Sequence, residues 1–462
     1  MNRPSDSTSV TEQNAGRPWL VENENPCSNT STVAMGGSLR RCRRGWVQSA
    51  PRGVPPPEVA MSREQLVEMA RREIENLAAD RIDLADDVFR MPTSAYYDPD
   101  RWRLEVDRIF KRLPLALGFS CELPDPGDYR SLEVCGVPVL MARDIDGEVR
   151  AFVNMCSHRG AIVVDEGRGN SRGFRCPYHA WSYDLQGNLV SIFDSGNFGD
   201  VDKSCYGLTP LPCSERAGLV WVTLNPSSDV DIDLFLAGYD EMLDHLGFAD
   251  CHVIGRQNLD GPNWKVAYDG YRDLYHIPIL HRNSFGPDSA YQPDYYAWGS
   301  HVRMVSPTRF TRAADLPEDQ WQMEDLTPGI WTIFPNISIA GGRGSAAYDG
   351  QGGATPFMVS QMFPGKTPEE SVTIQNFLLP EEPDPDDEER YAEIMKMYFD
   401  VVGDEDYYTG FRVQRALKTG AKDHNLFGRN EGGGQMFHKW VQALIDTEDK
   451  DLNALLERGV EV

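Results

Sequence analysis

The sequence lacks the features that would place a protein in a membrane or on nucleic acid. No apolar run in the chain approaches the roughly 18–20 residues that a membrane-spanning helix requires. The N-terminus also lacks the apolar core of a secretory signal. Positive charge is scarce, because 45 Lys and Arg residues stand against 71 Asp and Glu residues, a formal net charge of -26. Since such a chain repels phosphate groups, we expect a cytoplasmic protein with neither a nucleic-acid partner nor a membrane partner.

Cysteine is too scattered in this chain for a disulfide framework. Nine cysteines, an odd number, are spread over 462 residues, whereas disulfide-stapled domains are short and dense in cysteine. Reduced thiols or metal ligands are the better interpretation. The sequence also shows no internal repeats and no flavin or nicotinamide motif. The glycine-spaced segment GRGNSRG at 167–173 precedes a strand-like run rather than a helix, so the context of a dinucleotide site is missing.

The composition divides the chain into four regions. Residues 1–60 are rich in Ser, Asn, Pro, Gly and Arg and have no helical or strand period, which predicts a disordered extension and makes Met61 an alternative native start. Apolar residues at helical spacing follow over 61–112. Short β-rich runs separated by Gly, Asp and Pro turns predict a small antiparallel β domain over 113–225. Helices and strands mix over 226–462, so we expect an α+β protein.

Two mixed pairs of soft-metal ligands lie in the β-rich region. Cys156 and His158 form a C-x-H pair, and Cys176 and His179 form a C-x-x-H pair after seventeen intervening residues. Zinc fingers space their ligands as C-x₂₋₄-C and H-x₃₋₅-H, so the mixed pairs argue against zinc. They match a Rieske [2Fe–2S] centre, in which both cysteines bind one iron and both histidines bind the other.

A second set of ligand residue types lies in the mixed region. The segment NWKVAYDGYRDLYHIPILH at 263–281 contains Asp273, His276 and His281. On a helix, Asp273 and His276 share a face, and a kink at Pro278 brings His281 back toward the same centre. Two imidazoles and one carboxylate form the facial triad of non-heme Fe(II) oxygenases. The carboxylate of such a triad must come from elsewhere in the chain.

The segment CSHRG…CPYHAWSYDLQGNL resembles the Rieske domain of the ring-hydroxylating oxygenase family, and the resemblance extends over roughly residues 85–440. It is similar to the α subunits of the phenylpropionate-dioxygenase-like group. Respiratory Rieske proteins carry an extra cysteine in each loop, where this chain has Ala161 and Tyr178. The resemblance implies a small antiparallel β Rieske domain over 113–225. It also implies a larger α+β catalytic domain over 226–462, preceded by its N-terminal helical part, with a central antiparallel sheet flanked by helices in the helix-grip manner.

The resemblance also supplies the missing carboxylate ligand. In the family it lies well downstream on a C-terminal helix, in a D-D or E-D pair ahead of a glutamine. In the segment GDEDYYTGFRVQ, Asp406 stands eight residues before Gln414, which is the spacing of the family. We therefore expect Asp406, rather than Asp404, Glu405 or Asp423, to complete an iron site with the two histidines.

The resemblance gives Asp273 a catalytic role between two metal centres. In the family this carboxylate bridges a Rieske histidine of a neighbouring subunit to an iron histidine, here His179 and His276. That arrangement implies a head-to-tail homotrimer, with or without a β subunit. Many members carry Glu-Asn shortly before this aspartate, where this chain has Tyr268 and Asp269. The extra carboxylate either orients a polar substrate or accepts backbone hydrogen bonds.

The remaining expectations concern the pocket and the other histidines. The apolar strands WTIFPNISIA and MVSQMF are expected to line the pocket or to form plain sheet core. Five histidines lack ligand partners and are expected to be surface or ordinary hydrogen-bonded residues: His245, His252, His301, His424 and His438.

The implied function is that of a terminal oxygenase component, an oxidoreductase of the EC 1.14 class. It would use O₂ and NAD(P)H-derived electrons to hydroxylate an aromatic or related small organic substrate, with a [2Fe–2S] Rieske cluster and a mononuclear Fe(II) as cofactors. Because the chain has no motif for a redox cofactor that accepts hydride, a separate NAD(P)H-dependent reductase, with or without a ferredoxin, must supply the electrons. Two alternatives stay open: a monooxygenase or demethylase on the same scaffold, and a Rieske electron-transfer protein without oxygenase activity.

Overall fold

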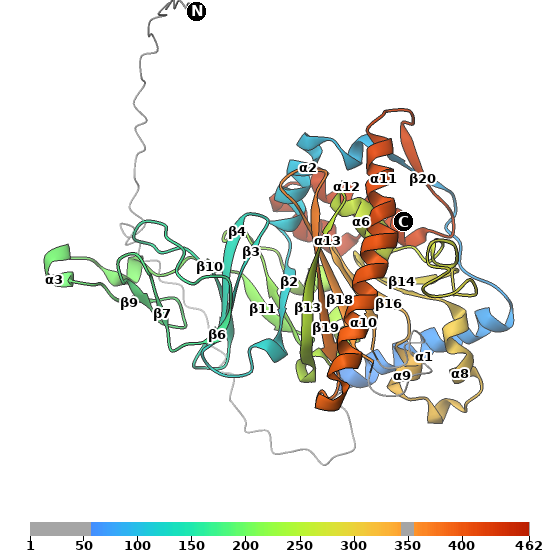
Figure 1. Ribbon diagram of the computed structural model, residues 1–462, viewed down its shortest axis with the longest axis horizontal. Coiled ribbons are helices and arrows are strands. Elements are labelled where there is room, and N and C mark those ends of the chain that lie inside the picture. The colour runs from blue at the N-terminus through green and yellow to red at the C-terminus, as the bar shows by residue number, and fades with distance from the viewer. Residues whose placement is uncertain (1–56, 343–354, 462) are drawn as a thin grey trace, which may run out of the picture. The chain divides into compact units, whose positions relative to one another are not determined.

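The computed structural model describes residues 57–342 and 355–461. The disordered extension predicted for residues 1–60 therefore lies outside the described residues as far as residue 56. Helices and antiparallel strands mix along the described chain, which confirms the predicted α+β fold class (Figure 1). None of the helices in these two ranges is both long and apolar enough to cross a membrane.

The β-rich region forms small antiparallel sheets. A five-stranded sheet has the order β10-β5-β4-β3-β6, and two three-stranded sheets have the orders β7-β8-β9 and β11-β12-β2. One hydrophobic cluster contains Cys156 and Cys176 together with Phe174, Trp181 and Tyr183, so both cysteine-bearing loops pack on a common core. The elements are β2 (Leu115–Phe119), β3 (Asp128–Val134), β4 (Val137–Arg143), β5 (Val149–Val153), β6 (Gly167–Asn170), β7 (Phe174–Arg175), β8 (Ser182–Tyr183), β9 (Leu189–Ser191), α3 (Ser195–Phe198), β10 (Pro210–Leu211), β11 (Cys213–Arg216) and β12 (Leu219–Val222).

A seven-stranded antiparallel sheet forms the centre of the second region, in the order β13-β19-β18-β17-β16-β15-β14. Its strands are β13 (His252–Gly261), β14 (Asp294–Trp298), β15 (His301–Val305), β16 (Ile330–Ile333), β17 (Ile337–Gly341), β18 (Phe357–Pro364) and β19 (Ser371–Leu379). The inner strand β18, third in this order, is buried along its whole length, as expected of a strand that is covered on both faces.

Helices flank this sheet, as predicted. The α-helices of the described chain outside the β-rich region are α1 (Pro57–Ala78), α2 (Pro99–Glu105), α4 (Ile232–Leu236), α5 (Tyr239–Asp244), α6 (Trp264–Tyr271), α7 (Ile277–Leu280), α8 (Thr311–Ala314), α9 (Met323–Leu326), α10 (Glu388–Asp400), α11 (Tyr408–Leu417), α12 (Gly432–Asp446) and α13 (Leu452–Arg458). Helix α6 contacts β18 and β19, and α10 contacts β13. Strand β1 (Phe89–Pro92) pairs with β20 (His424–Phe427), which joins the N-terminal helical region to the C-terminal part of the chain.

Helix α6 is held at its first turn by buried polar contacts. The side chain of Asn263 caps the helix by accepting the backbone N–H of Lys265 at 2.9 Å. The ammonium group of Lys265 pairs with Glu105, and both side chains are fully buried. The indole N–H of Trp264 donates to the same carboxylate at 2.9 Å. Because an unpaired buried charge is costly, these contacts fix α6 against α2 and so fix the chain that leaves its far end.

Candidate metal centres

The two predicted Rieske loops have the same backbone geometry. In each loop the carbonyl of the cysteine, Cys156 or Cys176, accepts the N–H of the residue four positions on, at 2.9 and 3.0 Å. The N–H of each cysteine donates to the carbonyl five positions on, at 2.8 Å in both loops. The residue four positions on is left-handed in both, with φ 75° at Gly160 and φ 58° at Ala180. Because an alanine rarely adopts this conformation, the shape of the second loop is imposed by its surroundings.

The side chains of these loops fit an iron–sulfur cluster. Cys156 and Cys176 are buried free thiols, and the rings of His158 and His179 meet edge to face with centroids 4.6 Å apart. Nδ1 of His158 is buried and has no hydrogen-bond partner, as expected of an atom that faces a metal. Burial and the neighbouring His179 lower the pKa of His158, which favours the neutral imidazole that binds metals. Trp181 stacks on the His158 ring at 4.9 Å and fixes its plane.

Tyr183 contacts the first of the two predicted Rieske loops, although the sequence motif gave it no role. Its hydroxyl oxygen accepts the backbone N–H of Ser157 at 3.1 Å and lies 3.2 Å from Sγ of Cys156. Since the oxygen already accepts one hydrogen bond from the backbone, its own proton is directed toward the sulfur. Burial and the contact with Cys156 raise the pKa of Tyr183, so the hydroxyl stays a donor. The signal available in the sequence was its place two residues after Trp181.

Residues 263–281 do not form the single kinked helix that the sequence predicted. Helix α6 ends at Tyr271, and Asp273 lies in the turn that follows. The carboxylate of Asp273 accepts the backbone N–H of Tyr275, and its other oxygen lies 3.0 Å from Nδ1 of His276. An aspartate that bonds the backbone two residues on favours a turn over a helix. The prediction of a shared helix face is therefore wrong, although Asp273 and His276 do meet.

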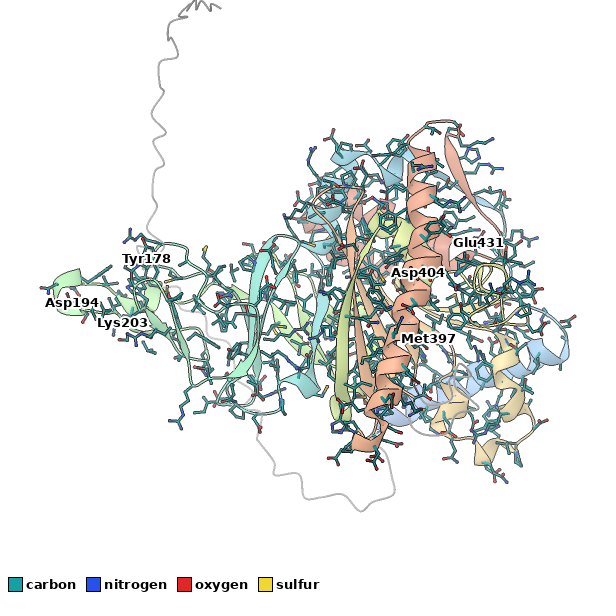
Figure 2. The ribbon with its side chains drawn as sticks, viewed as in Figure 1. Tyr178, Asp194, Lys203, Met397, Asp404 and Glu431 are labelled. Carbon is teal, nitrogen blue, oxygen red and sulfur yellow. The ribbon has the colours of Figure 1, made fainter. Side chains whose placement is uncertain are left out.

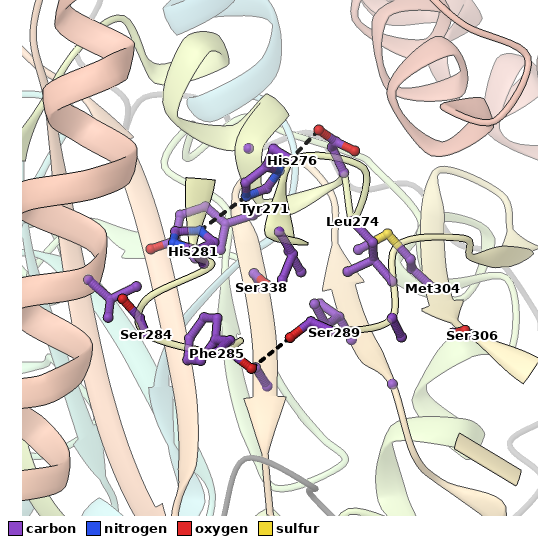
Figure 3. Close-up of a pocket in the computed structure, with 18 of the residues that line it drawn as sticks. Tyr271, Leu274, His276, His281, Ser284, Phe285, Ser289, Met304, Ser306 and Ser338 are labelled. Carbon is purple, nitrogen blue, oxygen red and sulfur yellow. Dashed lines mark hydrogen bonds and ion pairs between the residues drawn. The ribbon is translucent and has the colours of Figure 1, made fainter. Parts of the chain in front are cut away.

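The single-turn helix α7 places the two predicted iron histidines. His276 precedes its first residue and His281 follows its last, and their Nε2 atoms lie 3.2 Å apart (Figure 3). Oδ1 of Asp406 lies 3.1 Å from Nε2 of His281 and 3.6 Å from Nε2 of His276. One ligand atom from each of the three predicted residues thus converges on a common point. Two imidazole nitrogens and one carboxylate oxygen are the donor set that suits a mononuclear Fe(II).

Asp406 reaches this point from a π-helical segment, Val401–Tyr407, inserted between α10 and α11. Such insertions occur frequently at functional sites. The glutamine of the motif, Gln414, is buried on α11, and its side-chain oxygen accepts the backbone N–H of Asn263 at 2.5 Å. Its amide also donates to the carbonyl of Glu369 at 2.9 Å. Gln414 therefore ties the helix that carries Asp406 to the start of α6.

The outer nitrogen of His281 also has a carboxylate partner. Nδ1 of His281 lies 2.6 Å from Oε2 of Glu405, a residue that the sequence reasoning passed over in favour of Asp406. The hydroxyl of Ser284 donates to the other oxygen of Glu405. Burial lowers the pKa of His281, but the carboxylates of Asp406 and Glu405 outweigh it and raise the pKa above its ordinary value. In the sequence, only the adjacency to Asp406 pointed to Glu405.

A cavity of about 720 Å³ opens beside the three ligand residues. Apolar groups and hydroxyls line it together, among them Tyr271, Phe285, Met304, Met358 and Tyr398, with Ser284, Ser289, Ser306, Thr308 and Ser338. The predicted pocket strands contribute in part, since β17 supplies Ser338 and β18 supplies Met358. Trp331 and Phe334, from the same predicted stretch, belong to the hydrophobic core, because successive side chains of a strand point to opposite faces.

The unusual carboxylate of Asp269 is held by side chains. The hydroxyl of Tyr96 donates to it at 2.7 Å, and Nε2 of His438 lies 2.9 Å from its other oxygen. Neither of the two roles expected from the sequence, backbone acceptor or substrate anchor, accounts for these contacts. Asp269 instead joins α6 to α12 and to the N-terminal region.

His301 and His245 also have structural partners. His301 is fully buried, its Nε2 lies 2.8 Å from the carbonyl oxygen of Phe235, and burial lowers its pKa to about 4. Nε2 of His245 lies 2.8 Å from the hydroxyl of Ser62. These contacts agree with the ordinary hydrogen-bonded role expected from the sequence.

Two family models match this chain in separate segments. A model described as the Rieske [2Fe-2S] domain matches residues 114–199. A model described as the ring hydroxylating alpha subunit (catalytic domain) matches residues 248–447. The first segment contains all four predicted cluster ligands, and the second contains His276, His281 and Asp406.

Curated relatives with related domains include both monooxygenases and dioxygenases. The glycine betaine monooxygenase oxygenase subunit of Chromohalobacter salexigens is 32% identical over 193 residues, which cover 41% of this chain and 43% of that protein. The benzene 1,2-dioxygenase subunit alpha of Pseudomonas putida is 31% identical over 269 residues, which cover 56% of this chain and 53% of that protein. The chain thus matches these relatives over about half of their length.

Solved structures share the fold over most of the chain. A quaternary ammonium Rieske monooxygenase has a TM-score of 0.64 and 22% identity, covering 77% of this chain and 96% of that chain. Naphthalene 1,2-dioxygenase from Rhodococcus sp. has a TM-score of 0.61 and 21% identity, covering 82% of this chain and 98% of that chain. At these identities the likeness concerns the fold alone.

The contact between Tyr183 and Cys156 predicts a change in the reduction potential of a bound cluster. A hydrogen bond to a ligating sulfur stabilises the extra negative charge of the reduced state. Tyr183→Phe should therefore lower the reduction potential, as measured by a redox titration followed in the visible spectrum. Tyr178→Phe, which removes an exposed hydroxyl from the second loop (Figure 2), should leave the potential unchanged. Equal potentials in Tyr183→Phe and the unmodified protein would rule out this role.

Proposed function

Because this chain belongs to the Rieske oxygenases, which join a Rieske [2Fe–2S] domain to a ring-hydroxylating catalytic domain, we propose that it is a terminal oxygenase component. It uses O₂ and NAD(P)H-derived electrons to hydroxylate a small organic substrate, aromatic or related. The observation that carries this proposal is the convergence of His276, His281 and Asp406 at the wall of a cavity of about 720 Å³. A structural metal site would have no need of such a cavity.

We assign the cluster to Cys156, His158, Cys176 and His179. We assign the mononuclear iron to His276, His281 and Asp406, which gives each cofactor a complete donor set. When bound, the cluster supplies electrons singly and the iron supplies activation of O₂. Asp273 and Glu405 orient the imidazoles of His276 and His281 by accepting their outer Nδ1–H groups, which leaves both Nε2 atoms to face the metal.

The cavity residues position the substrate and exclude water from it. Apolar groups such as Phe285 and Met358 remove an organic ring or chain from solvent. The hydroxyls of Ser289 and Ser338 offer hydrogen bonds to a polar substituent. A substrate with an apolar body and a polar group fits this wall best.

Asp273 supports a bridge between subunits. Its carboxylate contacts His276 and the backbone of Tyr275 within the chain, which leaves lone pairs to accept one more donor. We propose that this donor is His179 of the partner subunit in a head-to-tail homotrimer, with or without a β subunit. Exposed apolar side chains lie near both ends of such a contact, including Tyr178 beside His179, and Tyr275 and Ile279 beside Asp273. Large exposed apolar groups gathered in this way are typical of interaction surfaces.

The electrons require other proteins. We propose a separate NAD(P)H-dependent reductase, with or without a ferredoxin, in the cytoplasm. The net charge of -26 favours a docking surface of positive charge on that partner.

The carboxylate assignment makes a direct prediction. Asp406→Ala should lose all detectable turnover, because only two ligands for iron remain, while the visible spectrum of the Rieske cluster stays intact. The control is Asp404→Ala, an exposed acid on the same helical segment (Figure 2), which should keep wild-type turnover. Full coupled product formation by Asp406→Ala would show that the assignment is wrong.

The closest alternative is a monooxygenase or demethylase on the same scaffold. The relatives named above include the glycine betaine monooxygenase oxygenase subunit, which keeps this candidate open. Turnover under ¹⁸O₂ separates a dioxygenase reaction from a monooxygenase reaction. We expect two labelled oxygens in one product molecule, as a ring-hydroxylating dioxygenase places them. A single labelled oxygen would assign the chain to the monooxygenases instead. The electron-transfer protein is disfavoured, because it has no use for the three converging ligand residues.

A further inference from the structure

Glu405 contacts the His281 ring at Nδ1, the nitrogen on the ring edge that is turned away from the proposed iron. Its Oε2 lies 2.6 Å from Nδ1 of His281, whereas Oδ1 of Asp406 lies 3.1 Å from Nε2 of the same ring. Two consecutive residues therefore contact the two nitrogens of one imidazole. The His281 side chain is only 4% exposed, so the ring has little freedom to turn between them.

The helical segment explains how neighbouring residues reach both sides of one ring. Side chains of consecutive residues diverge by about 100° around a regular helix axis. Glu405 and Asp406 lie in the π-helical segment Val401–Tyr407, where the ring of His281 enters between the two diverging carboxylates. The hydroxyl of Ser284, three residues after His281, donates to the free oxygen of Glu405. The loop that carries the histidine thereby also fixes the carboxylate that holds it.

The contacts distinguish Glu405 from a metal ligand. One of its oxygens is taken by Nδ1 of His281 and the other by Ser284. The point where the Nε2 atoms of His276 and His281 meet is shared by Asp406. Glu405 is thus placed to accept a hydrogen bond from Nδ1–H of the imidazole, while Asp406 is placed to bind iron.

We propose that Glu405 is a positioning residue that sets the affinity of the mononuclear site for its metal. By accepting Nδ1–H of His281, it keeps the lone pair on Nε2, makes that nitrogen more basic and locks the ring plane. The inference rests on the proposed function of His281 as an iron ligand. With Asp273 at Nδ1 of His276, each iron histidine then has its own carboxylate acceptor.

The test is metal affinity measured on the full chain with its cluster in place. The mononuclear site is emptied with a chelator and titrated anaerobically with Fe(II), and with Co(II), whose absorption bands report the ligand geometry. Glu405→Ala should bind either metal about 10- to 100-fold more weakly, the range typical for such outer partners. Glu405→Gln, which retains an acceptor oxygen without the charge, should recover part of the loss. Ser284→Ala should show a smaller loss in the same direction.

The matched control is Asp404→Asn, which removes one negative charge from the same segment at an exposed position. It should bind metal like the unmodified protein, and this outcome excludes a general effect of net charge. An intact cluster spectrum in each variant shows that it has folded. If Glu405→Ala does not fold, the metal affinities of Glu405→Gln and Ser284→Ala are compared with that of the unmodified protein instead.

Two results would overturn the inference. Wild-type affinity in both Glu405 variants would show that the carboxylate has no influence on the metal. A loss in Glu405→Ala as complete as in Asp406→Ala, without partial recovery in Glu405→Gln, would make Glu405 a ligand instead. Failure of the unmodified protein to bind metal at this site is a separate outcome, which would contradict the proposed function itself.

Discussion

The candidate iron site depends on one buried junction, the hydrogen bond from the backbone N–H of Asn263 to the side chain of Gln414. Asn263 starts the helix whose far end leads into the two histidines, and Gln414 lies on the helix that continues from Asp406. The donor atoms of His281 and Asp406 come from positions far apart in the sequence and yet lie 3.1 Å apart. Without a fixed junction between the two helices, that distance would vary and the three ligands would not share a metal.

This junction gives a physical reason for the spacing between Asp406 and Gln414. A residue eight positions on lies about two helical turns away, so one helix presents the carboxylate at the cavity and the amide at the start of α6. The buried pair of Lys265 and Glu105 also holds α6 at its first turn. Both helix contacts are polar and buried, which costs stability unless every group is paired. The framework thus favours one arrangement of the site over looser alternatives.

The sequence was most informative where ligands are close together in the chain. Cys156 and His158 are separated by one residue, so their spacing alone indicated a cluster. The predicted fold class was confirmed, because alternating strand patterns and helical spacing are local signals. The choice of Asp406 depended on the family resemblance. Many acidic residues could supply a carboxylate ligand, and only the fold determines which of them reaches the two histidines.

The remaining features depend on tertiary contacts. The proximity of Glu405 to His281 and of Tyr183 to Cys156 arises only when separate segments pack together. The end of α6 was misplaced because the turn after it is set by hydrogen bonds of Asp273, which compete with the helix. These residues surround the ligands, where small displacements change metal chemistry and where sequence patterns carry least information.

The central claim is that one chain carries two different iron centres. The most direct measurement is the iron content of the purified, reconstituted protein, determined together with its EPR spectrum. We expect about three irons per chain with a Rieske signal, two in the cluster and one at the facial triad. A Rieske signal with only about two irons per chain would contradict the account.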